Sequence, residues 1–115
     1  MLSLEDLQKK IIAFRDARDW KQFHTPKDLA VGLSLEAGEV LEHFLWKTPD
    51  EIASYLKTHK EEIADEMGDV LNYLLIMAND FGIDLLDATD KKIDKNAQKY
   101  PVDKAKGRHT KYTEL

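Results

Sequence analysis

The chain has 115 residues, a length that suits one domain with a modest core. Its 43% hydrophobic and 34% charged residues exclude a disordered protein, and the absence of cysteine excludes disulfides and thiolate metal sites. The net charge of −5 argues against binding to duplex nucleic acid, which requires a basic face. The longest mainly apolar run, residues 70–78, is too short to cross a bilayer, and the N-terminus lacks a leader pattern. We therefore expect a cytoplasmic protein with no membrane partner.

Helical periodicity predicts three helices in the first half of the chain. A serine is placed to cap a helix over residues 4–17, where apolar residues recur every three or four positions. Thr25, followed by proline, marks the start of a second helix, which we expect to reach about residue 46. Thr48, again followed by proline, opens a short helix that ends near residue 56.

The second half of the chain predicts two longer helices and a tail. A capping-box pattern at Thr58 predicts the start of a long helix that ends near Gly82, a residue suited to a helix C-terminus. Asp84 is placed to cap a last helix, which ends before Pro101. Residues 102–115 look irregular and basic.

No segment alternates like a strand, so the sequence predicts an all-α fold. The long helix that ends near Gly82 carries a broad apolar surface, which includes Ile63 and Phe81 at its two ends. Three short neighbouring helices would not cover that surface. We therefore expect one domain, a bundle of four to five helices completed by dimerisation, as a homodimer or homotetramer.

Two pairs of carboxylates stand beside apolar stripes, Glu36 with Glu39 and Glu66 with Asp69. Residues three apart share one face of a helix. Carboxylates in such places are partly desolvated and repel one another, and a bound cation relieves both costs. Mg²⁺ prefers oxygen ligands and is the natural candidate.

A glycine stands inside each acidic pair, Gly38 in the first and Gly68 in the second. Glycine in a helix costs roughly 1 kcal/mol relative to alanine, so both positions need a reason. Close contact between the two helices is one such reason, and that contact would also bring the four carboxylates together.

Two other interpretations of the acidic residues remain open. Acidic pairs are common on solvated helix faces. A redox di-iron bundle is a second alternative, but it uses Glu-x-x-His pairs. Here His43 comes four residues after Glu39, and Asp69 stands where the second histidine would be. An all-carboxylate site suits Mg²⁺ or Mn²⁺ better than redox iron.

The segments "LEAGEVLEHFLWK" and "EEIADEMGDVLNYLL" resemble the MazG-like, all-α nucleoside triphosphate pyrophosphohydrolases. The flanking "RDWKQFHTPKDL" and "KIDKNAQKYPV", with the final "KYTEL", are similar to the dCTP pyrophosphatase branch of that family. The resemblance implies Mg²⁺-dependent cleavage between the α and β phosphates, with Mn²⁺ as a possible substitute, in an obligate dimer that often forms a tetramer. It implies a housekeeping enzyme of nucleotide-pool sanitation.

The resemblance also assigns catalytic and metal-binding roles to the four acidic motif residues, which are Glu36, Glu39, Glu66 and Asp69. Many relatives have a further glutamate before the first of these, where this chain has Leu35. The motif therefore does not name the residue that activates the attacking water.

Basic residues near the end of the last predicted helix are candidates for binding the substrate phosphates. Lys92, Asn96 and Lys99 share one helix face, and the family match points to the same residues. Lys111 and Tyr112 in the tail are candidates to close over the site. The alternatives are a solvated basic face and a frayed terminus.

Aromatic side chains offer flat surfaces for a base. The resemblance favours His24 and Trp46, with Tyr73 reaching the same pocket through its hydroxyl, although an aromatic at a helix end is more often a core plug. A helix of about 20 residues is roughly 30 Å long, so His24 and Trp46 would have to come from different subunits. The competing function is a non-catalytic helical oligomeric interaction module.

Overall fold

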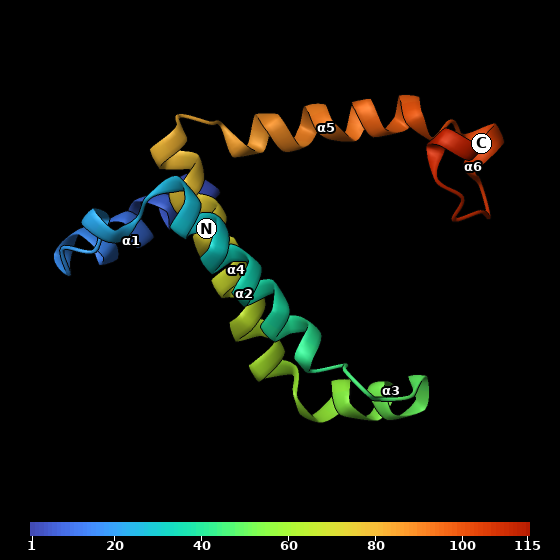
Figure 1. Cartoon of the computed structure of the whole chain (residues 1–115), viewed down its shortest axis with the longest axis horizontal. Coiled ribbons are helices and arrows are strands. Elements are labelled where there is room, and N and C mark those ends of the chain that lie inside the picture. Colours follow the sequence, from blue (N-terminus) through green and yellow to red (C-terminus); the bar gives the residue numbers. More distant parts are fainter. The chain divides into compact units, whose positions relative to one another are not determined.

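The computed structural model describes residues 1–115 and contains only helices and connecting segments, which confirms the all-α prediction (Figure 1). The chain divides into an N-terminal unit, Met1–Gly82, and a C-terminal unit, Ile83–Leu115. No helix is long and apolar enough to cross a membrane. The organisation as one domain stays a prediction.

Four α-helices and one 3₁₀ turn form the N-terminal unit. These are α1 (Leu4–Ala17), η1 (Lys21–Phe23), α2 (Pro26–Glu42), α3 (Pro49–Thr58) and α4 (Lys60–Phe81). Helix α2 runs along α4, and α1 packs against another part of α4 (Figure 1). The core lies at these contacts, where Leu29 and Leu75 are each only 1% exposed.

A buried ion pair joins α1 to the end of α4. The side chain of Arg15 is 2% exposed, and its Nη1 donates to both carboxylate oxygens of Asp80 at 2.9 and 2.8 Å. Burial alone would raise the pKa of Asp80, but hydrogen bonds from Arg15 and Asn79 outweigh it and lower the pKa. The pair therefore satisfies a charge that would otherwise be costly to bury.

Two predicted helix boundaries are wrong. Helix α2 ends at Glu42 rather than near residue 46, because the next amides bond back three residues and Trp46 takes a positive φ of 65°. The capping box at Thr58 does not form either. Thr58 is instead the last residue of α3. The His59 amide donates to the Tyr55 carbonyl, so the hydrogen bonding of α3 continues past the expected break. Helix α4 then begins at Lys60.

Helix α5 (Leu85–Lys99), α6 (Val102–Ala105) and η2 (Tyr112–Glu114) form the C-terminal unit. The predicted cap at Asp84 is confirmed, since its side chain accepts from the amide of Asp87. The tail is more regular than predicted. Amides after Pro101 form a helical turn, and the Tyr112 ring packs edge-on against Tyr100 with centroids 5.9 Å apart.

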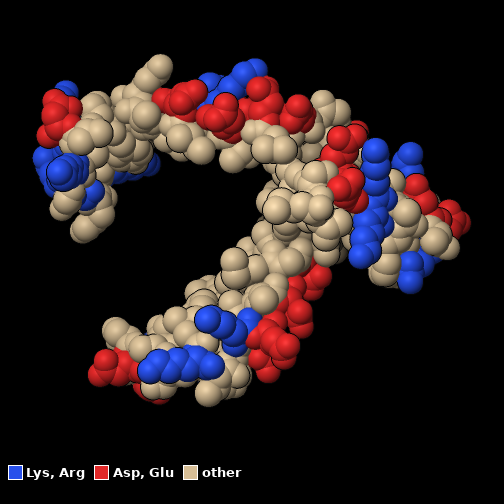
Figure 2. Space-filling view, turned by 180° about the vertical axis from the view of Figure 1, so that it is seen from behind, with Lys and Arg blue, Asp and Glu red and all other residues tan.

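Along α2 and α4, a run of acidic side chains borders a broad surface without charges (Figure 2). Large apolar side chains on these helices are exposed, among them Leu35 at 66%, Leu41 at 59% and Met67 at 59%. The exposed apolar side chains therefore lie on both helices, but the stripe expected on the long helix is covered in part, since Ile63 at one end of it is buried.

Candidate active site

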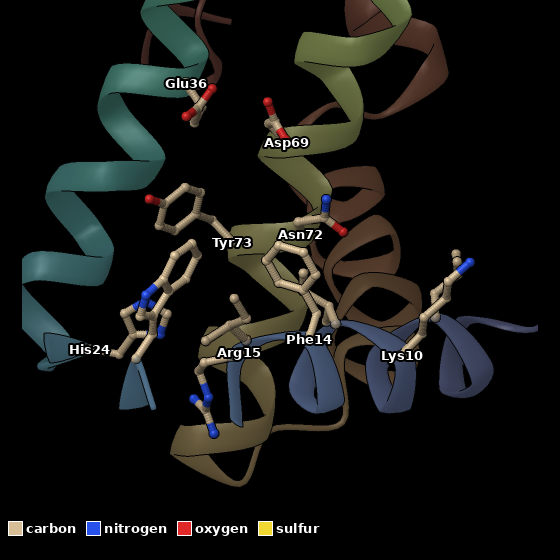
Figure 3. Close-up of a pocket in the computed structure, with 12 residues that line it drawn as sticks. Lys10, Phe14, Arg15, His24, Glu36, Asp69, Asn72 and Tyr73 are labelled. Carbon is tan, nitrogen blue, oxygen red and sulfur yellow. The ribbon is translucent and has the colours of Figure 1, made fainter. Parts of the chain in front are cut away.

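The four acidic motif residues lie on two helices that run side by side, Glu36 and Glu39 on α2, and Glu66 and Asp69 on α4. The carboxylates of Glu36 and Asp69 point toward one another across the gap between these helices (Figure 3). Burial raises the pKa of Glu36, and the nearby carboxyl groups of Glu39, Asp69 and Glu66 raise it further. The fold therefore gathers like charges that oppose one another's ionisation.

One oxygen of this cluster, Glu36 Oε2, is buried without a hydrogen-bond partner, whereas Glu66 Oε2 is buried in contact with His43 Nε2. An unsatisfied buried oxygen is costly, and a divalent cation would satisfy the Glu36 oxygen and relieve the repulsion between the carboxylates. No three side chains already form a complete metal-binding group. An open set of carboxylates of this kind suits Mg²⁺, which keeps several waters and substrate phosphates among its ligands.

A pocket of about 540 Å³ adjoins the carboxylates and extends toward α1 and η1 (Figure 3). Glu36 and Asp69 lie at one part of its wall, and apolar and aromatic side chains form most of the rest. The lining residues are Leu7, Lys10, Ile11, Phe14, Arg15, Trp20, His24, Glu36, Asp69, Asn72, Tyr73 and Ile76. A volume of this size suits a small organic ligand.

Tyr73 occupies its place because α2 has a glycine opposite it. A Cβ atom added at Gly32 would lie 2.4 Å from Tyr73 Cε1, which is closer than any real contact. The ring therefore rests directly on the α2 backbone and forms a wall of the pocket. Gly38 and Gly68 differ, since a Cβ at either would meet nothing within 4 Å. Close helix contact does not explain these two glycines within one chain.

Two of the three predicted base-binding residues, His24 and Tyr73, line this pocket. The Nδ1 atom of His24 is buried without a partner, so it is free to bond a ligand. Trp46 does not line the pocket, and its side chain is 92% exposed. The prediction that Trp46 acts in another subunit's pocket stays a prediction.

Sequence reasoning missed several pocket residues, including Phe14, Trp20 and Asn72. Asn72 carried a signal, because it is the polar residue in an apolar run and follows Asp69 by three positions. Trp20 was one of several aromatics in a connector. Its placement depends on the chain reversal after α1, where Asp19 takes a φ of 54°, and that reversal has no plain sequence signature.

The candidate phosphate-binding residues belong to the C-terminal unit. Lys92 and Asn96 line one shallow hollow on α5, together with Ala88, Thr89 and Ile93. Lys99 is directed over the ring of Tyr112, with its Nζ 4.7 Å from the ring centroid. Lys111 directly precedes η2. Their roles toward a substrate stay predictions.

Known proteins resemble this chain closely. The sequence profile of the MazG-like family matches residues 31–115. The dCTP pyrophosphatase 1 of Mus musculus is 40% identical over 115 residues, which span 98% of this chain and 68% of that protein. The dCTP pyrophosphatase 1 of Homo sapiens is 39% identical over the same shares. A crystal structure of a pyrophosphatase from Archaeoglobus fulgidus matches with a TM-score of 0.82 and 40% identity, covering 88% of this chain and 94% of that one.

Proposed function

The chain belongs to the MazG-like family and is a nucleoside triphosphate pyrophosphohydrolase, and we propose that its substrate is dCTP, cleaved between the α and β phosphates. The products are dCMP and pyrophosphate. The observation that supports this most is the pocket that adjoins the facing carboxylates of Glu36 and Asp69. It supplies a place for the base directly beside a place for the phosphates.

We assign Glu36, Glu39, Glu66 and Asp69 as the ligands of Mg²⁺, with Mn²⁺ as a substitute. When bound, the metal neutralises charge on the phosphate oxygens and activates water for attack. By holding the metal, the carboxylates would keep the triphosphate end of the nucleotide at the mouth of the pocket. The buried and unpartnered Oε2 of Glu36 supports this assignment.

The pocket favours one orientation of the nucleotide. Arg15 lines the pocket, but its charge is already matched by Asp80 at 2.8 Å. That wall therefore offers little net attraction to a phosphate and suits an uncharged base instead. Trp20 and Phe14 provide flat surfaces there, and stacking on such surfaces contributes roughly 1–3 kcal/mol per base.

Selection among bases requires more than stacking, which tolerates every base. A pocket sized for one ring excludes purines by steric clash. Hydrogen bonds to the base edge then separate cytosine from uracil and thymine, because a mismatched base leaves buried groups unpaired. His24, with its unpartnered Nδ1, is our candidate for one such bond, and Tyr73 supplies a second polar group.

We also propose that the triphosphate receives positive charge and hydrogen bonds from the C-terminal unit. The residues proposed for this role are Lys92, Asn96, Lys99 and Lys111.

The proposed active form is a homodimer or homotetramer. The exposed apolar side chains on α2 and α4 support a subunit contact, because large exposed apolar patches commonly mark interfaces. Action in the cytoplasm is part of the same proposal. In an oligomer, Trp46 of one subunit would reach the base held by another.

Pyrophosphate release from dCTP, measured with Mg²⁺ and with EDTA, tests the proposed activity. We expect release with Mg²⁺ and none with EDTA. The competing function, a non-catalytic interaction module, predicts no release in either condition. A panel of the common ribo- and deoxynucleoside triphosphates, ranked by kcat/KM, then tests the base preference. Equal values for dATP and dCTP would refute the proposal that the pocket excludes purines by its size.

A further inference from the structure

Glu66 differs from the other three carboxylates in having a histidine against it. His43 Nε2 lies in contact with Glu66 Oε2, and the two side chains are 12% and 25% exposed. Both atoms are buried and have no other hydrogen-bond partner. Separating them would leave two buried polar atoms unsatisfied, so the contact fixes how the Glu66 carboxylate is turned.

The other ring nitrogen of His43 is held as well. Its Nδ1 lies 2.5 Å from the hydroxyl of Tyr55. A neutral imidazole has one donor nitrogen and one acceptor nitrogen. Donation from the Tyr55 hydroxyl to Nδ1 leaves the proton on Nε2, and Nε2 then donates to the Glu66 carboxylate. Tyr55 thereby selects the form of His43 that suits Glu66.

Tyr55 is itself held by two neighbouring side chains. Its ring stacks on His59 with centroids 3.8 Å apart and planes 2° from parallel, and Lys47 Nζ lies 4.4 Å from the ring centroid. Tyr55 belongs to α3, while His43 directly follows α2 and Glu66 belongs to α4. A chain of contacts therefore runs from α3, through the residue that follows α2, to the Glu66 carboxylate on α4.

We propose that His43 and Tyr55 are positioning residues that clamp Glu66 for metal binding, an inference that rests on the metal-dependent activity proposed above. His43 holds one carboxylate oxygen, so the other oxygen is left to face the cation in a fixed direction. Partners of this kind, which bond to a ligand rather than to the metal, commonly change metal affinity by about 10–100-fold when removed. The same contact gives α3 a role in an active site that it does not itself line.

Mn²⁺ affinity, measured without nucleotide by the electron paramagnetic resonance of the free ion, tests the clamp. We expect His43→Leu to weaken Mn²⁺ binding by about 10–100-fold. His43→Gln should keep most of the affinity, because its amide can both donate to Glu66 and accept from Tyr55. Tyr55→Phe keeps the ring stack and loses only the hydroxyl, so we expect an intermediate loss. Tyr100→Phe, the same change in the C-terminal unit, is the matched control and should bind Mn²⁺ like the wild type.

Steady-state kinetics adds a second readout. At limiting Mg²⁺ the His43→Leu protein should lose activity on dCTP, and saturating Mg²⁺ should restore most of its kcat. A purely structural defect would persist at every Mg²⁺ concentration. If His43→Leu fails to fold, His43→Gln and Tyr55→Phe carry the comparison.

The possible failures are distinguishable. If His43→Leu and Tyr55→Phe both bind Mn²⁺ within about twofold of the wild-type affinity, the clamp is overturned while the metal site stays intact. If His43→Leu does not fold, the same result in Tyr55→Phe alone overturns the clamp. Absence of Mn²⁺ binding to the wild-type protein would instead refute the metal-dependent function on which the clamp depends.

Discussion

The two units of the chain are both helical, yet only one of them has a buried interior. The N-terminal unit buries Leu29 and Leu75 almost completely, and it contains the carboxylate cluster and the large pocket. The C-terminal unit contains no buried side chain, and apolar residues such as Leu86 and Ile93 remain 64% and 62% exposed. Helix formation alone therefore does not create a site here.

The difference shows what gives the carboxylates their chemistry. Partial burial between α2 and α4 raises the pKa of Glu36, whereas acids and bases on α5 stay solvated and pair only with near neighbours. We expect substitutions in the N-terminal unit to affect catalysis and folding strongly, and those in the C-terminal unit to affect substrate affinity.

The largest expected effect is on catalysis. Glu39→Gln and Asp69→Asn should each lower kcat for dCTP by about a thousandfold or more, because metal ligation requires the charge and is worth several kcal/mol. The amides keep the shape, so both proteins should fold, and their melting temperatures without metal should equal or exceed that of the wild type. Full turnover by either variant at ordinary Mg²⁺ would remove these residues from the metal site.

The next effect is on stability. Asp80→Asn should lower the free energy of unfolding by about 3 kcal/mol, because it removes the partly buried carboxylate partner of the buried Arg15 guanidinium and leaves only the exposed Asp16. The control is Asp87→Asn, which breaks the exposed pair of Asp87 with Lys91 and should cost less than about 1 kcal/mol. Urea denaturation of both variants gives the comparison. Equal losses of stability in the two variants would mean that the buried pair in the N-terminal unit stabilises the chain no more than the exposed pair in the C-terminal unit does.

The same ion pair predicts a pH dependence of folding. The pKa of Asp80 in the folded chain lies below its ordinary value of 3.8. At pH values between these two pKa values, the unfolded chain binds more protons than the folded chain. The pair's stabilisation is complete above about pH 3.8 and is lost as pH falls through the lower folded value. Acid titration followed by circular dichroism should show a smaller loss of stability below pH 3.8 in Asp80→Asn. An unchanged acid profile would contradict the assignment.

A smaller effect is expected in the C-terminal unit. Lys92→Ala should raise KM for dCTP by about 10-fold and change kcat little, because a charged hydrogen bond contributes roughly 1.5–3 kcal/mol. Lys91→Ala is the control, since Lys91 pairs with Asp87 at 2.8 Å. A fall in kcat with unchanged KM would place Lys92 in the chemical step rather than in binding.

The smallest effect concerns glycine. Gly68→Ala should stabilise the chain by about 1 kcal/mol, because a Cβ there meets nothing within 4 Å and alanine favours the helix. Gly32→Ala is the contrasting variant, since its Cβ would clash with Tyr73. Thermal melting of both variants is the measurement. Destabilisation by Gly68→Ala would mean that a partner subunit covers this face in solution.

The sequence predicted most helices because their ends carry local signals. Ser3 and Asp84 form the expected caps, and Gly82 takes the left-handed conformation with a φ of 68°. The family, the fold class and the enzyme class are likewise confirmed. The predicted helix start at Thr58 was wrong because its capping pattern competes with α3, whose hydrogen bonds extend through Thr58.

The site was only partly predictable, for a physical reason. The acidic motifs follow helical spacing, so their shared faces can be read from sequence. The pocket depends instead on where α1 and its connector return against α4, which is a tertiary property. The placement of Trp20 arises from that packing, and the contact of His43 with Glu66 arises from the packing of α2 against α4; neither has a local pattern.

The seating of Tyr73 on Gly32 has a consequence for how substrate choice can change. The ring that forms a pocket wall is held by a backbone position that does not itself line the pocket. Any side chain at position 32 would displace the ring from α2 and alter the width of the pocket. The size limit for a nucleotide can therefore shift through one remote substitution, while the residues proposed to bind phosphate and metal stay the same.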